Sequence, residues 1–303
     1  MAIVREWFQL VQEPLDVLPT PSALREGLSQ ADVAIVTLGD RIDAETIHAA
    51  ARLKILANYA VGYNNIDLAA AQQRGLIVTN TPDVLTDATA DLTWALILAT
   101  ARCVVEGDSL IRSGRWTGWS PTQLLGAEVS DKTLGIIGMG RIGQAVAQRA
   151  VGFRMAVRYH TSHPPATSTF PCEWEFQSLR DLLEEADIVT IHIPLTPATH
   201  HLIGARELDW MKPTAFLINT ARGPIVDEGA LVEALTKGTI AGAGLDVYEQ
   251  EPALHPALAK LKQVVLLPHL GSATLHARVQ MGLVCLKNIQ AVLEGRLAPN
   301  QVH

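Results

Sequence analysis

Three ionisable side chains in the second half of this 303-residue chain are of the types that proton transfer and anion binding need. Arg222 lies in NTARGPIVDEGAL, Glu251 in LDVYEQEP and His269 in LLPHLGSAT, and each segment follows or contains an apolar run typical of a buried strand. Open parallel sheets bind ligands in a crevice at the carboxyl ends of their strands, so we expect all three side chains to face one crevice. Histidine titrates in the range of a general acid, a neighbouring carboxylate would orient it, and arginine can grip a carboxylate with two hydrogen bonds.

Each of these residues also has a purely structural interpretation. An arginine after a strand can be a solvated charge, and Glu251 before Pro252 can be a turn residue. His269, between Pro268 and Gly271, can cap the helix that follows. Because the three stand at the ends of three separate strands, their joint occurrence favours catalysis.

A glycine turn in the middle of the chain indicates where a cofactor would bind. The sequence GMGRIG at Gly138–Gly143 stands between KTLGII, a short buried strand, and QAVAQRAV, which has helical spacing. In a dinucleotide-binding turn, Gly138 would permit the tight bend, Gly140 would leave room for a pyrophosphate, and Gly143 would let the helix approach the strand. The free N–H groups at the helix start would face the phosphates. A tight turn without a ligand is the alternative.

Apolar runs alternate with helical patterns along the chain, which is typical of parallel sheets with crossover helices. Strands are predicted at Val33–Thr37, Lys54–Asn58, Leu76–Asn80, Lys132–Ile137, Met155–Tyr159, Ile188–His192, Ala215–Asn219, Gly242–Asp246 and Val264–Leu267. Helices are predicted at Ala44–Arg52, Leu68–Arg74, Asp87–Val105, Gln144–Val151 and Ala273–Leu293, and Arg5–Gln12 can also be helical.

These elements predict an α/β fold of two Rossmann-like domains with parallel sheets. The larger, dinucleotide-binding domain, residues 100–272, is inserted in a smaller flavodoxin-like domain formed by residues 1–99 and completed by the returning helix in 273–303. The segment Thr161–Thr169 resembles a linker, but it follows the second strand of the dinucleotide unit. We therefore interpret it as a loop at the edge of the cofactor site.

Composition and charge exclude several classes of partner. A net charge of −7 without a dense Lys/Arg run disfavours nucleic acid and anionic membranes. No apolar run approaches the roughly 20 residues of a membrane span, and the N-terminus lacks the order of a signal peptide. Cys103, Cys172 and Cys285 are too few and too far apart for a disulfide framework or a zinc site. We expect a cytoplasmic protein with no metal centre.

The chain resembles the D-isomer-specific 2-hydroxyacid dehydrogenase family from Val61 to Ala273. The matching stretches, in the family's order and spacing, are VGYNNIDLAAAQQRGLIVTNTPDVLTDATADL, GIIGMGRIGQAVA, HIPLTPATHHLI, LINTARGPIVDEGAL, GLDVYEQEP and LPHLGSA. Family members open with a strand and helix before the segment matching Leu15–Asp43. Only fourteen residues precede that segment here, which leaves open whether the first strand is present.

The resemblance implies roles for individual residues. It assigns catalysis to Arg222, Glu251 and His269, and it makes the smaller domain the substrate domain. Substrate contacts fall on Val61 and Gly62, whose backbone amides would bind the substrate carboxylate, and on Arg222 and Trp119. Cofactor contacts fall on Gly138, Met139, Gly140, Arg141, Ile142, Gly143, His160, Thr161, Ser162, Pro194, Thr199, Thr220, Ala221, Asp246 and Gly271. Among these, Arg141 would contact phosphate and Asp246 would face the nicotinamide amide.

The stretch RSGRWTGWSPTQLLGAEV is similar to the glyoxylate/hydroxypyruvate reductase branch of the family. In that branch a tryptophan from the partner subunit closes over the substrate, and Trp119 matches it. The resemblance therefore implies a homodimer whose interface includes Leu110–Leu125. The alternative is a loop tryptophan that packs on its own domain.

The predicted cofactor is NADP(H), with NAD(H) also accepted. NAD-preferring sites carry an acidic residue about 20 residues after the glycine turn, but no Asp or Glu occurs between Asp131 and Glu173. His160, Thr161 and Ser162 stand at the expected place and can donate hydrogen bonds to a 2′-phosphate. The reductase branch usually has an arginine in this loop, and none follows His160 there.

The predicted function is NAD(P)H-dependent reduction of small 2-oxo acids, namely glyoxylate to glycolate and hydroxypyruvate to D-glycerate. One alternative is a phosphite dehydrogenase or another 2-hydroxyacid dehydrogenase of the same fold. Formate is disfavoured because formate enzymes of this group carry Gln where Glu251 stands. The other alternative, a dinucleotide-sensing corepressor-like binding protein, is disfavoured by the lack of a low-complexity arm.

Overall fold

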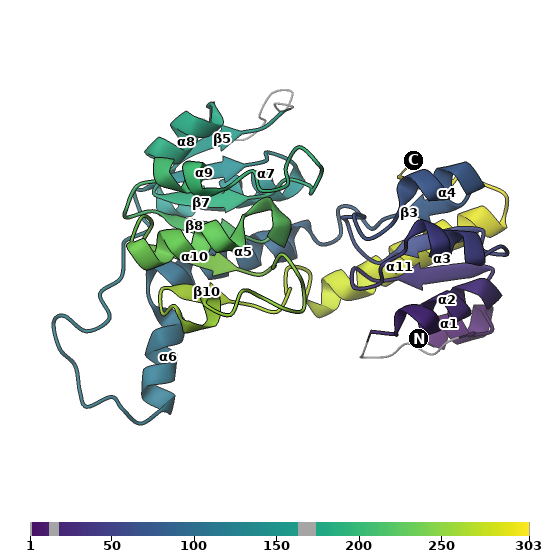
Figure 1. Ribbon diagram of the computed structural model, residues 1–303, viewed down its shortest axis with the longest axis horizontal. Helices are drawn as coiled ribbons and strands as arrows, with labels where there is room; N and C mark the ends of the chain where they lie inside the picture. The colour runs from purple at the N-terminus through teal and green to yellow at the C-terminus, as the bar shows by residue number, and fades with distance from the viewer. Residues whose placement is uncertain (1, 12–17, 163–173, 303) are drawn as a thin grey trace. The chain divides into compact units, whose positions relative to one another are not determined.

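The computed structural model describes residues 2–11, 18–162 and 174–302, and these form two compact units. Unit 1 consists of Met1–Val84 and Thr274–His303, and unit 2 consists of Leu85–Ala273. Both units are built on parallel sheets (Figure 1). The predicted α/β class is therefore confirmed.

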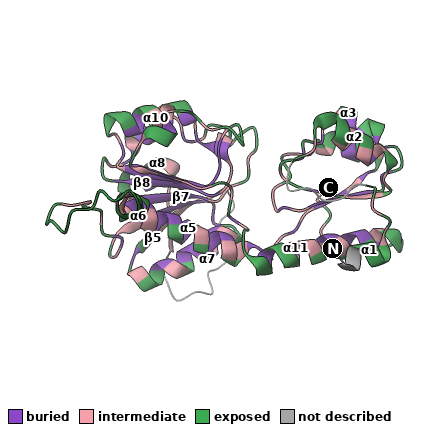
Figure 2. Cartoon of the chain, turned by 90° about the horizontal axis from the view of Figure 1, so that it is seen from below, coloured by how far each residue is buried: buried purple, intermediate pink, exposed green. Residues whose placement is uncertain are grey.

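Unit 1 contains a three-stranded parallel sheet in the order β1-β2-β3. Its elements are α1 Ala2–Trp7, α2 Pro21–Gln30, β1 Val33–Val36, α3 Ala44–Ala49, β2 Ile55–Asn58, α4 Leu68–Arg74, β3 Ile77–Thr79 and α11 Leu275–Leu293. Ile55 and Ala57 of β2 pack with Cys285 and Ile289 of α11 on one face of the sheet. The opposite face packs against α2, α3 and α4, and Figure 2 shows α2 and α3 across the sheet from α11.

Unit 2 contains a seven-stranded parallel sheet in the order β10-β9-β8-β7-β4-β5-β6. Its strands are β4 Thr133–Ile137, β5 Ala156–His160, β6 Trp174–Phe176, β7 Ile188–Ile191, β8 Phe216–Asn219, β9 Gly242–Leu245 and β10 Val264–Leu266. Its helices are α5 Thr86–Ala101, α6 Val104–Arg112, α7 Arg141–Ala150, α8 Leu179–Glu185, α9 Ala205–Trp210 and α10 Glu228–Lys237, with short 3₁₀ turns at Val151–Phe153, Gly223–Ile225 and Leu258–Lys260. One apolar cluster joins the sheet to α8, α9 and α10, and a second joins it to α5 and α7.

Helix α5 belongs to unit 2, so the boundary falls before residue 85 and not after residue 99 as predicted. The contacts of Trp94 in α5 account for this boundary. Its ring stacks on Phe153 with centroids 4.6 Å apart, and its indole N–H donates to the Val146 carbonyl at 3.1 Å. Arg149 of α7 adds ion pairs to Asp87 and Asp91 on the same helix. Helix α5 therefore packs on α7 and the turn that follows it, and it is part of the core of unit 2.

The predicted single helix Asp87–Val105 is in fact two helices. Cys103 adopts a left-handed conformation, with φ of 52°, which interrupts the helical hydrogen-bond ladder between α5 and α6. Helix α6 has no buried residue, unlike α5. The chain then returns to the end of α5, where the Ala127 N–H donates to the Ala101 carbonyl at 2.8 Å. Residues 102–126 thus form an excursion, a segment that leaves the end of α5 and returns to it.

Two smaller differences from the predicted elements concern the edge of the larger sheet and the N-terminus. Strand β6 was not predicted, because its three residues carry little periodic signal. Helix α1 ends at Trp7, earlier than the Arg5–Gln12 pattern suggested, and no described residue before β1 forms a strand. Most of the predicted loop Thr161–Thr169 lies outside the described residues.

Within the described residues no single helix is long and apolar enough to cross a membrane. Only α5 and α6 taken together, bent by 66° at the break between them, reach that length and composition.

Candidate active site

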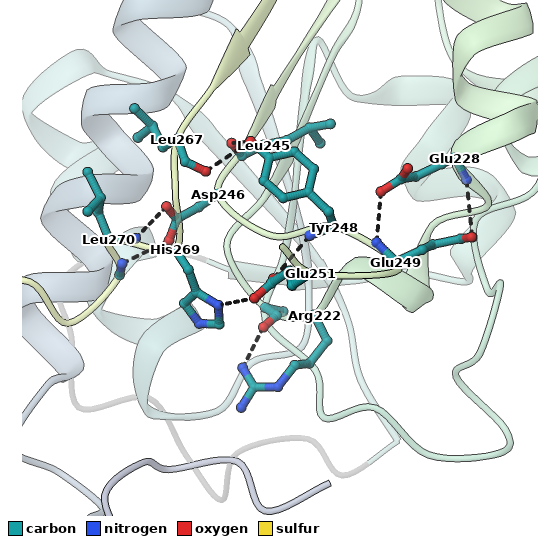
Figure 3. Close-up of polar contacts among 12 residues, drawn as sticks. Arg222, Glu228, Leu245, Asp246, Tyr248, Glu249, Glu251, Leu267, His269 and Leu270 are labelled. Atoms are coloured by element: carbon teal, nitrogen blue, oxygen red, sulfur yellow. Dashed lines mark hydrogen bonds and ion pairs between the residues drawn. The ribbon is translucent and has the colours of Figure 1, made fainter. Parts of the chain in front are cut away.

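Arg222, Glu251 and His269 lie beyond the carboxyl ends of three adjacent strands. Arg222 follows β8, Glu251 lies in the loop after β9, and His269 follows β10. These strands are neighbours in the sheet, paired in parallel register. The three loops therefore lie at one edge of the sheet, as expected for residues at the carboxyl ends of parallel strands. Figure 3 shows the three side chains there.

A hydrogen bond joins His269 to Glu251. Nδ1 of His269 lies 2.8 Å from Oε2 of Glu251. The other carboxylate oxygen, Oε1, accepts a hydrogen bond from the Tyr248 N–H at 3.1 Å. With Nδ1 held by the carboxylate, Nε2 is on the far edge of the ring, where it can exchange a proton with a bound ligand.

The environment of Glu251 keeps its carboxyl group ionised. Burial by itself would raise the pKa of Glu251, but the hydrogen bond and charge of His269, the Tyr248 N–H and the charge of Arg222 outweigh burial and lower it. Glu251 is therefore a carboxylate at neutral pH. This ionised carboxylate accepts the hydrogen bond from Nδ1–H of His269 and so fixes the orientation of the ring.

Arg222 is held by the turn that carries it. Its Nη1 donates to the Ala221 carbonyl at 2.6 Å. Burial lowers the pKa of Arg222, and the charge of Glu251 acts in the opposite direction. The guanidinium remains protonated, because arginine does not lose its proton in proteins.

Asn219, the last residue of β8, braces the turn and was not recognised in the sequence. Its Nδ2 donates to the Arg222 carbonyl and its Oδ1 accepts from the Ala221 N–H, both at 3.0 Å. Asn219 is 1% exposed, so both bonds are shielded from water. The signal was available, since Asn219 stands at a strand end like the residues that were singled out.

Gly223 allows the Arg222 turn to approach the Glu251 loop. A Cβ at residue 223 would lie 1.8 Å from the carbonyl carbon of Tyr248 and 2.4 Å from the Glu249 nitrogen. Both of those atoms belong to rigid backbone, so no side-chain rotation can relieve the clash. Only glycine lets these two loops pack at this distance.

Asp246 fixes the backbone after His269. Its carboxylate accepts the Leu270 N–H at 2.6 Å and the Gly271 N–H at 2.8 Å. Burial raises the pKa of Asp246, while those two N–H groups and the charge of His269 lower it in part. The Asp246 carbonyl also accepts the His269 N–H at 2.9 Å. His269, with φ of 56°, is thereby held in a left-handed conformation.

The glycine turn after β4 has the shape that a dinucleotide requires. Gly138 has φ of +100°, and a Cβ there would lie 2.5 Å from the His192 carbonyl oxygen. A Cβ on Gly143 would lie 2.0 Å from the Gly138 carbonyl oxygen, whereas a Cβ on Gly140 would meet nothing within 4 Å. The first and third glycines are thus needed for packing, and the space in front of Gly140, at the start of α7, fits a pyrophosphate.

The remaining residues that the sequence assigned to the cofactor lie at or beyond the carboxyl ends of strands in unit 2. His160 ends β5, and its carbonyl accepts the Gly138 N–H at 2.8 Å. The Thr199 hydroxyl donates to the Pro194 carbonyl at 2.7 Å in the loop after β7. Met139, Arg141 and Ile142 form the glycine turn and the start of α7, while Thr161 and Ser162 follow β5, and Thr220, Ala221 and Gly271 follow β8 and β10.

Helix α5 supports two of these positions through buried hydroxyl groups. The Thr93 hydroxyl lies 3.0 Å from the Thr220 hydroxyl, and the Thr89 hydroxyl donates to the Gly271 carbonyl at 3.0 Å. Thr89 and Thr93 are both buried. The helix therefore connects the end of β8 to the end of β10.

In unit 1, two asparagines hold the loop that the sequence assigned to the substrate carboxylate. Asn80 Nδ2 donates to the Val61 carbonyl at 2.9 Å, and Asn58 Nδ2 donates to the Gly62 carbonyl at 2.8 Å. A trans peptide points its C=O and N–H in opposite directions. The Val61 C=O and the Gly62 N–H belong to one peptide, so the hydrogen bond from Asn80 to the Val61 carbonyl orients the Gly62 N–H away from Asn80. Both asparagines stand at or just beyond strand ends, and sequence reasoning missed them.

Trp119 is 81% exposed within this chain. That exposure is inconsistent with the interpretation in which Trp119 packs on its own domain. Trp116, three residues earlier, is 50% exposed. The two rings lie on the excursion formed by residues 102–126.

A glycine turn opening a helix, with a histidine–carboxylate pair and an arginine at the same sheet's carboxyl edge, defines the class of dinucleotide-dependent α/β dehydrogenases. Comparison with known proteins narrows the class. The NAD binding domain of the D-isomer specific 2-hydroxyacid dehydrogenases matches residues 94–271. The chain belongs to the D-isomer specific 2-hydroxyacid dehydrogenase family, as its motifs predicted.

Relatives of known sequence and structure agree with this membership. Glyoxylate reductase from Thermococcus gammatolerans is 48% identical, with 99% of this chain and 91% of the relative covered. Glyoxylate reductase from Pyrococcus horikoshii is 50% identical, over 92% of this chain and 85% of the relative.

Among solved structures, a protein from Thermus thermophilus is 50% identical with a TM-score of 0.88, covering 95% of this chain and 91% of that one. The NADPH-dependent glyoxylate/hydroxypyruvate reductase from Sinorhizobium meliloti, solved with NADP and malonate, is 36% identical with a TM-score of 0.84, covering 91% and 85%.

Gly223→Ala is expected to lower kcat/KM at least tenfold, because the new methyl group must separate the loops that carry Arg222 and Glu251. Misplacement by about 1 Å can cost about 100-fold in rate. The control is Gly152→Ala, where a Cβ would meet nothing within 4 Å. Steady-state kinetics with a 2-oxo acid would check this, and wild-type kinetics for Gly223→Ala would contradict the close approach described above.

Proposed function

We propose that this chain is a cytoplasmic reductase that uses NAD(P)H to convert glyoxylate to glycolate and hydroxypyruvate to D-glycerate. The observation that carries the proposal is the 2.8 Å contact between His269 and Glu251, at the sheet edge that also holds Arg222. Family membership and the relatives described as glyoxylate reductases support the choice of substrate. No nucleic acid or membrane partner is part of the proposal.

The residues of the site have distinct roles in this reaction. A bound nicotinamide supplies the hydride that reduces the carbonyl carbon. His269, protonated at both ring nitrogens, gives the Nε2 proton to the carbonyl oxygen as that oxygen gains negative charge. Glu251 holds the ring through the hydrogen bond to Nδ1. Arg222 would bind the substrate carboxylate and polarise the carbonyl. The family resemblance also assigns carboxylate binding to the N–H groups of Val61 and Gly62.

The residues that would hold the dinucleotide are those assigned from the sequence. The start of α7, from Gly140 to Gly143, would bind the pyrophosphate through the backbone N–H groups of its first turn. Arg141 would add a charged contact to phosphate. Asp246 would accept a hydrogen bond from the nicotinamide amide beside the Gly271 backbone that it already holds.

A substrate panel combined with one variant tests the function. We expect glyoxylate or hydroxypyruvate to give the highest kcat/KM among glyoxylate, hydroxypyruvate, pyruvate, formate and phosphite, each assayed with both nicotinamide cofactors. His269→Ala should reduce kcat by about 10²–10⁴-fold, the range of general acid catalysis. Its Kd for NADPH, measured by fluorescence titration, should stay near the wild-type value.

The matched control is His48→Ala, which changes an exposed histidine of α3 in unit 1. A preference for phosphite or formate would overturn the substrate assignment. Retention of more than about a tenth of kcat by His269→Ala would overturn the role of the histidine, given the size of general acid effects.

We propose that NADP(H) is preferred and NAD(H) is accepted. The sequence has no carboxylate from Lys132 to Cys172, and Arg158, two residues before His160, forms ion pairs with Glu175 at 3.1 Å and Glu185 at 3.5 Å. Recognition of a 2′-phosphate therefore falls to the end of β5 and to Thr161 and Ser162. The Sinorhizobium meliloti structure, solved with NADP, supports this choice.

Thr161→Asp is expected to lower kcat/KM for NADPH and to spare or improve that for NADH. Two unit charges ~4 Å apart repel by about 4 kcal/mol at an effective dielectric of 20, and even a quarter of that changes the ratio about fivefold. His160→Asp tests the adjacent position. Thr236→Asp, on the exposed side of α10, controls for net charge. If neither of the first two variants changes the NADPH/NADH ratio, this segment does not contact the ribose.

We propose that the protein is a homodimer in which Leu110–Leu125 meets the partner and Trp119 reaches the partner's substrate site. Helix α6 has no buried residue, and Ile111, Trp119 and Leu125 are 55%, 81% and 73% exposed. A cluster of exposed apolar side chains on one excursion is typical of an interaction surface. A rigid indole wall would favour two- or three-carbon acids over bulky ones.

Light scattering at micromolar concentration should give twice the 32.7 kDa mass of one chain. Trp119→Ala should lower kcat/KM for glyoxylate while leaving NADPH binding unchanged, because the proposed contact of the ring is with the substrate and not with the cofactor. The matched control is Trp7→Ala, an exposed tryptophan of α1. A fully active monomer would refute the shared site.

A further inference from the structure

Glu228 has a buried carboxylate whose two oxygens both hold the loop that carries Glu251. Oε1 accepts the Glu249 N–H at 2.7 Å, and Oε2 accepts the His255 N–H at 2.9 Å. Glu228 is 7% exposed. Figure 3 shows Glu228 facing Glu249, on the side of the loop away from His269.

Glu249 in turn contacts the backbone of Glu228. Oε1 of Glu249 accepts the Glu228 N–H at 3.3 Å and lies 2.6 Å from His201 Nε2. The start of α10 does not need Glu228 as a cap, because Asp227 fills that place by accepting the Ala230 N–H at 2.9 Å. The carboxylate of Glu228 therefore accepts its hydrogen bonds from the loop and does not cap its own helix.

The chemistry of these contacts requires a carboxylate. Both partners of Glu228 are N–H donors, and an ionised carboxylate has only acceptors to offer them. A glutamine at residue 228 would satisfy one N–H and turn its own NH₂ group toward the other. Leaving a buried donor unsatisfied is costly, so the loop would shift to find another partner.

Glu251 lies between the two anchored N–H groups, two residues after Glu249 and four before His255. The distance from Glu251 Oε2 to His269 Nδ1 is 2.8 Å, so a small shift of the loop changes the orientation of the imidazole. We propose that Glu228 is a positioning residue for the reaction. It acts through Glu251, by holding the loop at both ends, and touches neither substrate nor cofactor. This inference rests on the catalytic roles of Glu251 and His269 proposed above.

A double-mutant cycle tests the proposal, because residues that act through one another are not additive. Glu228→Gln should lower kcat/KM about tenfold in the wild-type background, as expected for misplacement of a catalytic group. In the Glu251→Gln background the same substitution should change kcat/KM less than about twofold. The Kd for NADPH should not change. The control is Glu233→Gln, an exposed residue of the same helix that pairs with Lys237.

Glu249→Ala provides a second variant that leaves Glu228 in place, and its cycle decides the question if Glu228→Gln fails to fold. It removes the acceptor for the Glu228 N–H, and its effect should likewise disappear in the Glu251→Gln background. Equal losses in both backgrounds would overturn the inference, because they would indicate a general structural role. If Glu251→Gln itself has wild-type activity, the proposed catalytic pair fails, which is a different outcome.

Discussion

The site depends above all on one hydrogen bond, between Nδ1 of His269 and Oε2 of Glu251. The two side chains belong to loops that follow different strands, β9 and β10, so neither loop sets the distance by itself. The orientation of an imidazole is useful for proton transfer only within a narrow range. Most other features around this edge of the sheet can be understood as means of keeping the two loops in place.

Backbone anchoring by buried carboxylates is the main device. Asp246 holds the N–H groups of Leu270 and Gly271, and Glu228 holds those on either side of Glu251. Each carboxylate has two N–H donors, which offset part of the cost of its burial. Side-chain to backbone bonds of this kind fix a loop more firmly than contacts between long flexible side chains, which lose rotamer freedom when they form.

Much of this organisation follows from rules that apply to the sequence directly. The strand-end rule located Arg222, Glu251 and His269, because parallel strands must place their carboxyl ends at one edge. The α/β class and the family followed from periodic patterns and motifs, and both are confirmed. The break at Cys103 was missed, because an apolar run is equally typical of one long helix and of two.

By itself, then, the sequence determined what depends on local backbone geometry: the glycine turn, the strand ends and the residue types that stand there. Only the tertiary structure decided which loops touch. Gly223 against Tyr248, Glu228 against Glu249 and His255, and Asn80 against Val61 are contacts between segments separated by about twenty residues or more. The reason is that loop paths are set by packing between elements, which leaves no periodic trace in the chain. A buried glutamate and a solvated one look alike until the fold encloses one of them.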